Sequence, residues 1–284
     1  MSETLKEMPN PNREYFGALG TLRRKPGKEI TIPALEVCVT GVRAKPENLA
    51  AYREVCGFAD GDSLPITYPH VLAAPLHIRL MTGRQFPLPM LGLVHLRNKI
   101  TQTRELAVDE TFDVRVHTGV GRQTSKGLEF DFMTRYSDAQ GQEVWTGETT
   151  ILFRNRPAGG GVKKPPAAPD PRIAEYAELN APADIGRRYG RIAGDLNPIH
   201  LYAMTAKLFG FPRAIAHGMW TLARSAALTG AQLGRAPREL TVQFKQPLLL
   251  PARASLKVVA GDKGLEFSLL GASGGKVHLA GAIA

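Results

Sequence analysis

The hydrophobic and polar positions along the chain divide it into two halves of similar plan. Each half predicts a short helix, a loop, a longer helix and then several strands. In the second half, helix formers predict a helix from Pro198 to Phe209 that stops at Gly210, and a second helix from about Gly218 to Leu228. Apolar and polar residues alternate in the expected strands, at 240–244, 254–259, 265–270 and 276–283, and in the first half at 93–100, 111–117, 128–136 and 144–153.

This order of elements favours an α+β fold. A helix followed by a run of antiparallel strands must bury its apolar face against the sheet, which gives a two-layer unit. Two such units could join edge to edge around paired helices. We therefore expect one α+β layer in each half of the chain.

Short sequence identities support an internal duplication. The pentapeptide Lys-Gly-Leu-Glu-Phe occurs at 126–130 and again at 263–267, and the segment 52–57 aligns loosely with 189–194 at the same spacing. The segment between the halves, 155–171, is rich in Gly and Pro and has no apolar periodicity, which is typical of an exposed linker. We expect a first unit at 1–154 and a second unit at 172–284.

Composition narrows the function classes. Hydrophobic residues make up 43% and charged residues 22% of the chain, as in ordinary globular proteins. No apolar run is long enough to cross a bilayer and the start lacks the apolar core of a signal peptide, so we expect a cytoplasmic protein without membrane contact. We expect Cys38 and Cys56 to be reduced and buried.

The net charge of +10 does not predict nucleic-acid binding, because the basic residues are scattered and form no recognised motif. A basic surface also suits a substrate with several phosphates. Candidate phosphate contacts are spread along the chain, and a solvated surface explains each of them equally simply. These residues are Arg97, Lys99, Arg104, Lys245 and Arg253.

The segment from Asp195 to His200 carries the strongest candidate chemistry. Asp195, Asn197 and Pro198 form a good helix start with no further function, since a capping side chain precedes Pro at the first helical position. His200 changes this reading. In the first turn of a helix its imidazole is favoured in the neutral form, and beside Asp195 it could hold and activate one water molecule.

A second candidate follows at His217-Gly218-Met219, where the longer helix begins and free backbone N–H groups could stabilise an anion. Aligning Tyr68-Pro69 with Phe211-Pro212 places Pro75 opposite Gly218, and proline has no N–H. The first half also lacks a counterpart of the Asp195–His200 segment. We therefore expect one active site per chain, with the first half reshaped for substrate binding or support.

The remaining polar residues are assigned structural roles. Five histidines have no partner spacing, namely His70, His77, His95, His117 and His278. Asp195 and His200 have no third ligand nearby in the sequence, which argues against zinc. Ser225 and Ser255 lack the strained Gly-flanked turn of a nucleophile.

The residues from Tyr189 to Trp220 resemble a known signature. The run Ala193-Gly194-Asp195-Leu196-Asn197-Pro198-Ile199-His200, followed by Phe211-Pro212 and Ala216-His217-Gly218-Met219, resembles that of the MaoC-like (R)-specific enoyl-CoA hydratases. The wider chain is similar to their double-hotdog members, in which a degenerate first hotdog precedes a catalytic second one. The resemblance implies a double hotdog, with a long helix wrapped by an antiparallel sheet in each unit.

The resemblance also implies an activity. The expected reaction is reversible hydration of a trans-2-enoyl-CoA to the (R)-3-hydroxyacyl-CoA, without a metal or other cofactor. Asp195 would take a proton from water and His200 would deliver one to C2, or the reverse. Asn197 would support them, the Gly218 N–H would bind the thioester oxygen, and Pro198, His217 and Met219 would contact substrate.

Three alternatives remain open at this point. The substrate carrier could be an acyl carrier protein instead of CoA, the chain could be a hotdog acyl-CoA thioesterase, or it could bind acyl thioesters without catalysis. Both a monomer and a homodimer are compatible with a double hotdog, because the usual two-fold pair already lies within one chain.

Overall fold

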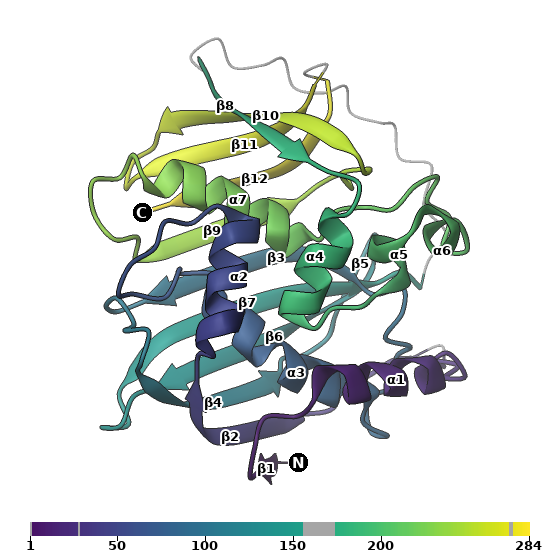
Figure 1. Cartoon of the computed structure of the whole chain (residues 1–284). Helices are drawn as coiled ribbons and strands as arrows, with labels where there is room; N and C mark the ends of the chain where they lie inside the picture. Colours follow the sequence, from purple (N-terminus) through teal and green to yellow (C-terminus); the bar gives the residue numbers. More distant parts are fainter. Residues whose placement is uncertain (1, 28, 156–173, 273–274) are drawn as a thin grey trace.

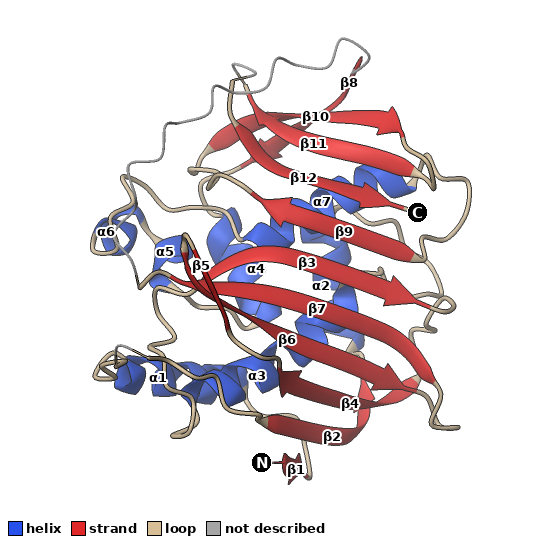
Figure 2. Cartoon of the chain, turned by 180° about the vertical axis from the view of Figure 1, so that it is seen from behind, coloured by secondary structure: helices blue, strands red, loops and turns tan. Residues whose placement is uncertain are grey.

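One continuous sheet organises the chain, and the helices cover one of its faces (Figures 1 and 2). The computed structural model describes residues 2–27, 29–155, 174–272 and 275–284. Twelve strands are present in these ranges, in the order β1-β2-β4-β6-β7-β3-β9-β12-β11-β10-β8, with β5 pairing to β6 beside this path. All neighbours on the path are antiparallel except β1 and β2.

The first half begins with a short strand and a helix that lie outside the repeated plan, β1 (Ser2–Leu5) and α1 (Pro11–Thr21). The repeated unit follows. Its elements are β2 (Glu36–Arg43), α2 (Pro46–Cys56), α3 (Tyr68–Thr82), β3 (Val94–Gln102), β4 (Thr111–Thr118), β5 (Arg122–Thr124), β6 (Gly127–Ser137) and β7 (Glu143–Phe153). The long helix α3 packs against β2, β4 and β6.

The second half repeats this order. Its elements are β8 (Ala174–Ala181), α4 (Ile185–Ala193), α5 (Pro198–Leu201), α6 (Ala203–Lys207), α7 (Gly218–Gly230), β9 (Glu239–Phe244), β10 (Ala252–Ala260), β11 (Leu265–Gly271) and β12 (Val277–Ile283). Here α7 is the long helix and packs against β9, β11 and β12. The fold is therefore a double hotdog, as the resemblance implied.

The two halves are related by a pseudo-two-fold arrangement centred between β3 and β9. These strands pair antiparallel, with Asn98 opposite Val242, and the strand order on one side of the pair repeats in reverse on the other. The duplicated pentapeptides occupy equivalent places, at the starts of β6 and β11. At both places a Cβ on glycine would collide with a backbone carbonyl, that of Phe153 for Gly127 and that of Ile283 for Gly264. The predicted duplication is confirmed.

Most predicted strands are confirmed to within a few residues, but the helix predicted from Pro198 to Phe209 is wrong. It is divided into α5 and α6 because Tyr202 has extended backbone angles of φ −142° and ψ 150° and caps the second helix. At this break, the guanidinium of Arg187 on α4 donates a hydrogen bond to the carbonyl of Leu201. A contact between helices thus overrides the local preference of a helix-forming sequence.

Several elements were missed. No predicted strand corresponds to β2 or β8, which begin the two units, or to β5, and no predicted helix range covers α1 or α4. The predicted linker 155–171 lies outside the described residues except for Asn155. Cys56 is buried as expected, whereas Cys38 is only half-buried. None of the helices in the described part of the chain combines the length and apolar character needed to cross a membrane.

Helices also join the halves across the pseudo-two-fold arrangement. The indole Nε1 of Trp220, on α7, donates to the carbonyl of Val55 on α2 at 2.9 Å. Arg224 donates to the carbonyl of Cys56, and Asn48 to that of Ile192. The buried hydrophobic residues of both halves form one main core cluster.

We expect the two halves to unfold as one cooperative unit because they share a sheet and a core. The chain has two tryptophans, Trp145 in the first half and Trp220 in the second. Fluorescence-monitored urea unfolding of Trp145→Phe and Trp220→Phe should each give one transition, coincident with that variant's own transition by circular dichroism. Fluorescence and circular dichroism transitions that separate in either variant would instead indicate independently unfolding halves.

Candidate active site

Asp195 is placed by the end of helix α4. The helix ends at Gly194, whose φ of +69° lies in the left-handed region that favours glycine. The chain reverses there, so Asp195 leaves the helix axis and enters a cavity. Its side chain is 42% accessible despite its position deep in the fold, because it faces this cavity.

Two glycines allow α4 to pack closely against the candidate site. Gly186 and Gly190 are four residues apart and therefore share one face of the helix. A Cβ at Gly186 would collide with the carbonyl of His200, and a Cβ at Gly190 would lie 2.7 Å from the carbonyl oxygen of Asp195. Any side chain on this face would displace the loop that carries both candidate residues.

Asn197 fixes the loop between Asp195 and His200. Its backbone N–H donates to Asp195 Oδ1 at 3.1 Å, and its side-chain oxygen accepts from the N–H of Ile199 at 3.4 Å. Pro198 follows at the start of α5, so the predicted capped helix start is confirmed. Pro198 does not line the cavity, unlike the other predicted site residues.

His200 presents one basic nitrogen. Its Nδ1–H donates to the carbonyl of Ile215 at 2.9 Å, so in the neutral ring Nε2 carries the lone pair. Burial lowers the pKa of His200 from its usual 6.5, although Asp195 and the hydrogen bond to Ile215 act in the opposite direction. The ring is therefore a neutral imidazole near pH 7, as the sequence predicted, but burial is the main cause.

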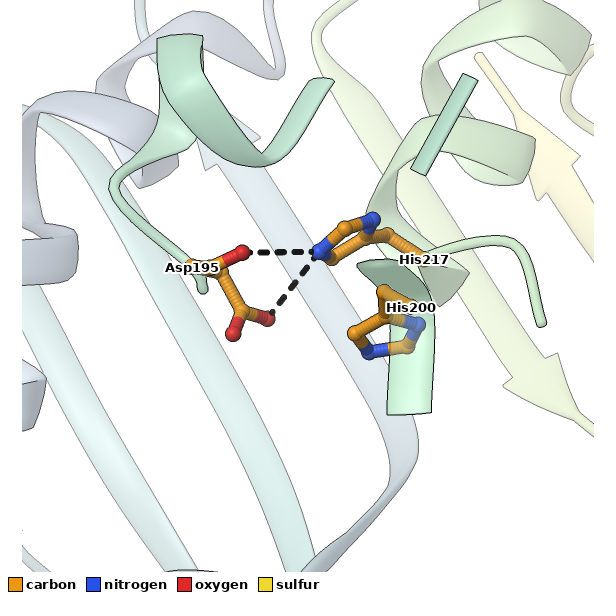
Figure 3. A group of neighbouring side chains, drawn as sticks. All are labelled: Asp195, His200 and His217. Carbon is orange, nitrogen blue, oxygen red and sulfur yellow. Dashed lines mark hydrogen bonds and ion pairs between the residues drawn. The ribbon is translucent and has the colours of Figure 1, made fainter. Parts of the chain in front are cut away.

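His217 connects Asp195 and His200 (Figure 3). Its Nε2–H donates to the backbone carbonyl of Asp195 at 3.1 Å and lies 3.6 Å from Asp195 Oδ2. The His217 ring stacks on that of His200 with centroids 3.7 Å apart and planes at 26°. Burial and the neighbouring His200 lower the pKa of His217 to about 3, so it remains neutral and acts as a hydrogen-bond donor.

Asp195 is the ionised member of the group. Burial raises the pKa of Asp195, but His217, His200 and hydrogen bonds from the Asn197 N–H and the Tyr15 hydroxyl outweigh burial, and the net pKa lies below the usual 3.8. A carboxylate thus stands beside two neutral imidazoles. Ligating atoms of the three residues lie within 4.8 Å of one another. A hydroxyl group placed about 2.8 Å from two such atoms would fit between them.

The sequence showed no third zinc ligand near Asp195 and His200, but in the structure His217 lies beside them. Its hydrogen bonding nevertheless fits a metal poorly. Nε2 is protonated and bound to the Asp195 carbonyl, while Nδ1 is buried without a hydrogen-bond partner among the described residues. The two imidazoles are also stacked, which does not direct both lone pairs to one point. The group is arranged for proton transfer.

The cavity that holds these residues has a volume of about 1040 Å³, at the upper end of the range for ligand sites. Gly218 lines it at the first residue of α7, where the backbone N–H has no partner within the helix. A Cβ at Gly218 would lie 3.1 Å from the ring of Phe244, so the position has little room for a larger side chain. Met219 and His217 line the same cavity.

The predicted equivalence of Pro75 and Gly218 is wrong. Gly218 begins α7, whereas Pro75 lies in the middle of α3, which begins at Tyr68. The first two residues of α3 nevertheless offer no free donor. The N–H of Tyr68 is already bound to the carbonyl of Pro65, and Pro69 has no N–H. The first residue of α3 thus lacks the free donor that the first residue of α7 offers.

Sequence reasoning missed the residues that the first half contributes. Tyr15 of α1 donates to Asp195 Oδ1 at 3.4 Å. His70, His77 and His95 line the cavity and contact one another, with the His70 ring centroid 5.4 Å from that of His77 and 6.1 Å from that of His95. They are far apart in the sequence from Asp195, and no local spacing could have identified them.

The candidate phosphate contacts are also revised. Of the five, only Lys245 lines the cavity, together with the exposed Lys126 and Arg154. Three of the others form ion pairs, Arg97 with Glu129, Arg104 with Glu110, and Arg253 with Glu178. Because Lys126, Arg154 and Lys245 are exposed and line the cavity, they mark its opening.

Comparison with known proteins gives one coherent result. Residues 162–276 match the family model described as "MaoC like domain". The chain is 38% identical over 278 residues to the 3-hydroxyacyl-thioester dehydratase X of Mycobacterium tuberculosis, covering 96% of this chain and 95% of that protein.

Solved structures agree with this match. The crystal structure of HtdX of Mycobacterium tuberculosis has a TM-score of 0.75 and 37% identity, covering 87% of this chain and 98% of that one. A MaoC-like dehydratase from Phytophthora capsici has a TM-score of 0.73 at 17% identity, covering 89% of this chain and 95% of that one. This second match shows a similar fold.

We expect Gly190→Ala to lower catalytic activity more than stability, because its Cβ would push the carbonyl of Asp195 and shift the carboxylate. A displacement of about 1 Å can reduce turnover by roughly 100-fold. Gly61→Ala is the matched control, since a Cβ there has no neighbour within 4 Å. Turnover and melting temperature should be measured for both. If Gly190→Ala had full activity, close packing of α4 would not matter to the site.

Proposed function

Because the chain belongs to the MaoC-like dehydratase family, we propose that it catalyses the reversible hydration of trans-2-enoyl thioesters to (R)-3-hydroxyacyl thioesters. One observation carries this proposal. A carboxylate, a neutral imidazole with a free nitrogen and an unpartnered helix N–H line the same cavity, at Asp195, His200 and Gly218. These are a proton-transfer pair and a site for a developing oxyanion.

The resting charges support a proton relay through His200. Asp195 is ionised and His200 is neutral, so neither holds a proton to donate before water is activated. In hydration, His200 Nε2 accepts a proton from the water that attacks C3, and Asp195 holds the remaining hydrogen. The imidazolium then gives its proton to C2. The site returns to its starting state. In this relay His200 performs both proton transfers, whereas the expectation from the sequence divided them between Asp195 and His200.

Gly218 supplies electrostatic stabilisation in this proposal. Addition at C3 moves negative charge to the thioester oxygen, and the N–H at the start of α7 points a donor and the positive end of the helix dipole toward such an anion. Removing one donor of this kind typically raises a barrier by about 3 kcal/mol. A side chain at residue 218 would meet the ring of Phe244, so glycine leaves the backbone N–H uncovered on this side.

His217 and Asn197 position the reacting groups. His217 holds the Asp195 carbonyl and supports the His200 ring by stacking, while Asn197 donates to Asp195 Oδ1. Met219 forms part of the cavity wall near the oxyanion site. In this proposal each predicted site residue that lines the cavity acts there, and Pro198, which does not line it, starts the helix that carries His200.

We propose CoA as the carrier. Lys126, Arg154 and Lys245 surround the opening of the cavity with positive charge, which suits the phosphates of CoA. The acyl group would extend between the halves, along first-half residues such as Met81 and Phe132. The large volume suits acyl groups longer than crotonyl. Rates with matched CoA and acyl-carrier-protein substrates would test the choice of carrier.

Asp195→Asn and His200→Gln should each fold normally and reduce hydration of crotonyl-CoA by about 10²- to 10⁴-fold, because each removes one of the two groups that activate water. Loss of the enoyl absorbance band measures the rate. The exposed Asp262→Asn is the matched control and should retain full activity. Wild-type activity should fall as the pH drops through the pKa of His200, which lies below 6.5, since only the neutral ring can accept a proton.

Two results would contradict the proposal. Near-normal hydration by Asp195→Asn would remove the pair from the mechanism. Steady release of free CoA thiol, without formation of the 3-hydroxyacyl thioester, would favour a thioesterase.

A further inference from the structure

Helix α1 brings a side chain from outside both hotdog units to the candidate site. Tyr15 lies on this helix, ahead of the first strand of the first unit, and is only 9% exposed. Its hydroxyl donates to Asp195 Oδ1 at 3.4 Å, across 180 residues of sequence. The matched MaoC-like region, 162–276, does not include this helix.

The contact is part of a packed interface. Pro11, at the start of α1, faces Gly194, where a Cβ would lie 2.6 Å from the proline Cβ. Tyr15 and Ala18 form a second hydrophobic cluster with Ile78, Met90 and Leu91, and Leu196 and Phe209 pack against it. Helix α1 therefore covers the residues on both sides of Asp195 in the sequence.

The segment just after α1 is fixed to the first unit by Arg24. The Arg24 guanidinium donates four hydrogen bonds to the carbonyls of Met81, Thr82, Gly83 and Leu88, at and beyond the end of α3. These groups include the carbonyls that a helix end leaves without partners. Because this segment is anchored, the position of Tyr15 relative to Asp195 is set by the packing of the first half.

The hydrogen bonds divide the two oxygens of Asp195 between two tasks. Oδ1 accepts from the Asn197 N–H and from the Tyr15 hydroxyl, whereas Oδ2 faces His217 Nε2 at 3.6 Å. With Oδ1 held by two donors, rotation of the carboxylate is restricted. Oδ2 is then the oxygen that can contact the reacting hydroxyl group.

Tyr15 remains a donor throughout the working pH range. Burial and the negative charge of Asp195 raise the pKa of the phenol. Five other groups act on Asp195 or are influenced by its charge, and they come from separate parts of the chain. His217 and His200 lower its pKa. His70 of α3, His95 of β3 and Tyr189 of α4 lie within electrostatic range. Among these neighbours, Tyr15 is the one whose hydroxyl binds the carboxylate.

We propose that Tyr15 is a positioning residue for hydration, which fixes the Asp195 carboxylate so that Oδ2 faces the reacting hydroxyl group. This inference rests on the proposed function of Asp195. It makes α1 part of the active site, although the helix belongs to neither hotdog unit.

The test is Tyr15→Phe, which keeps the ring and its packing and removes the hydroxyl. We expect kcat for crotonyl-CoA to fall about tenfold, the usual scale for one hydrogen bond to a charged group. KM, the Kd for unreactive butyryl-CoA and the melting temperature should stay close to wild type. Tyr202→Phe is the matched control, because Tyr202 is 54% exposed and does not line the cavity.

A double-mutant cycle separates positioning from a structural role. In the Asp195→Asn background, Tyr15→Phe should have no further effect on the residual rate, because the carboxylate on which it acts is gone. An unchanged kcat in Tyr15→Phe, or an equal loss in both backgrounds, would overturn the inference. Normal activity of Asp195→Asn alone would instead overturn the proposed function, so the two failures are distinguishable.

Discussion

The antiparallel pairing of β3 with β9 is the interaction on which the rest of the architecture depends. Arg97 to Thr101 pair with Gln243 to Glu239 and convert two separate sheets into one. The long helices α3 and α7 consequently lie on the same face and contribute to one cavity. The second half supplies Asp195, His200 and Gly218, while the first half supplies the opposite wall. Neither half encloses the cavity without the other.

Duplication followed by specialisation explains why the halves differ where they do. Both retain the strand order and the tight glycine at the start of β6 or β11, because these are required for the hotdog geometry itself. Of the two long helices, α7 has a free N–H at its first residue among the described residues, whereas the N–H of Tyr68, at the start of α3, is bound to Pro65. The first half instead contributes a wall of the large cavity, which in the proposed function would contact the acyl group.

Periodicity and short motifs predicted most of the strands, both long helices and the group around Asp195, because these depend on residues close together in the sequence. They could not predict Tyr15, His70 or His95, which reach the cavity only through tertiary packing. The error over Pro75 has a similar origin. Matching Tyr68-Pro69 to Phe211-Pro212 aligned similar residues, but helix starts determine which N–H groups are free, and those starts lie at Tyr68 and Gly218.

The charges of the groups around Asp195 limit where a proton can be held in the cavity. Three imidazoles of the first half and His217 are kept neutral by burial, so Asp195 carries the negative charge among them. When His200 accepts a proton, that carboxylate is the group able to stabilise the imidazolium, since its stacked neighbour His217 is uncharged. In the proposed hydration, transient protonation is therefore favoured at His200 Nε2, from which C2 would receive its proton.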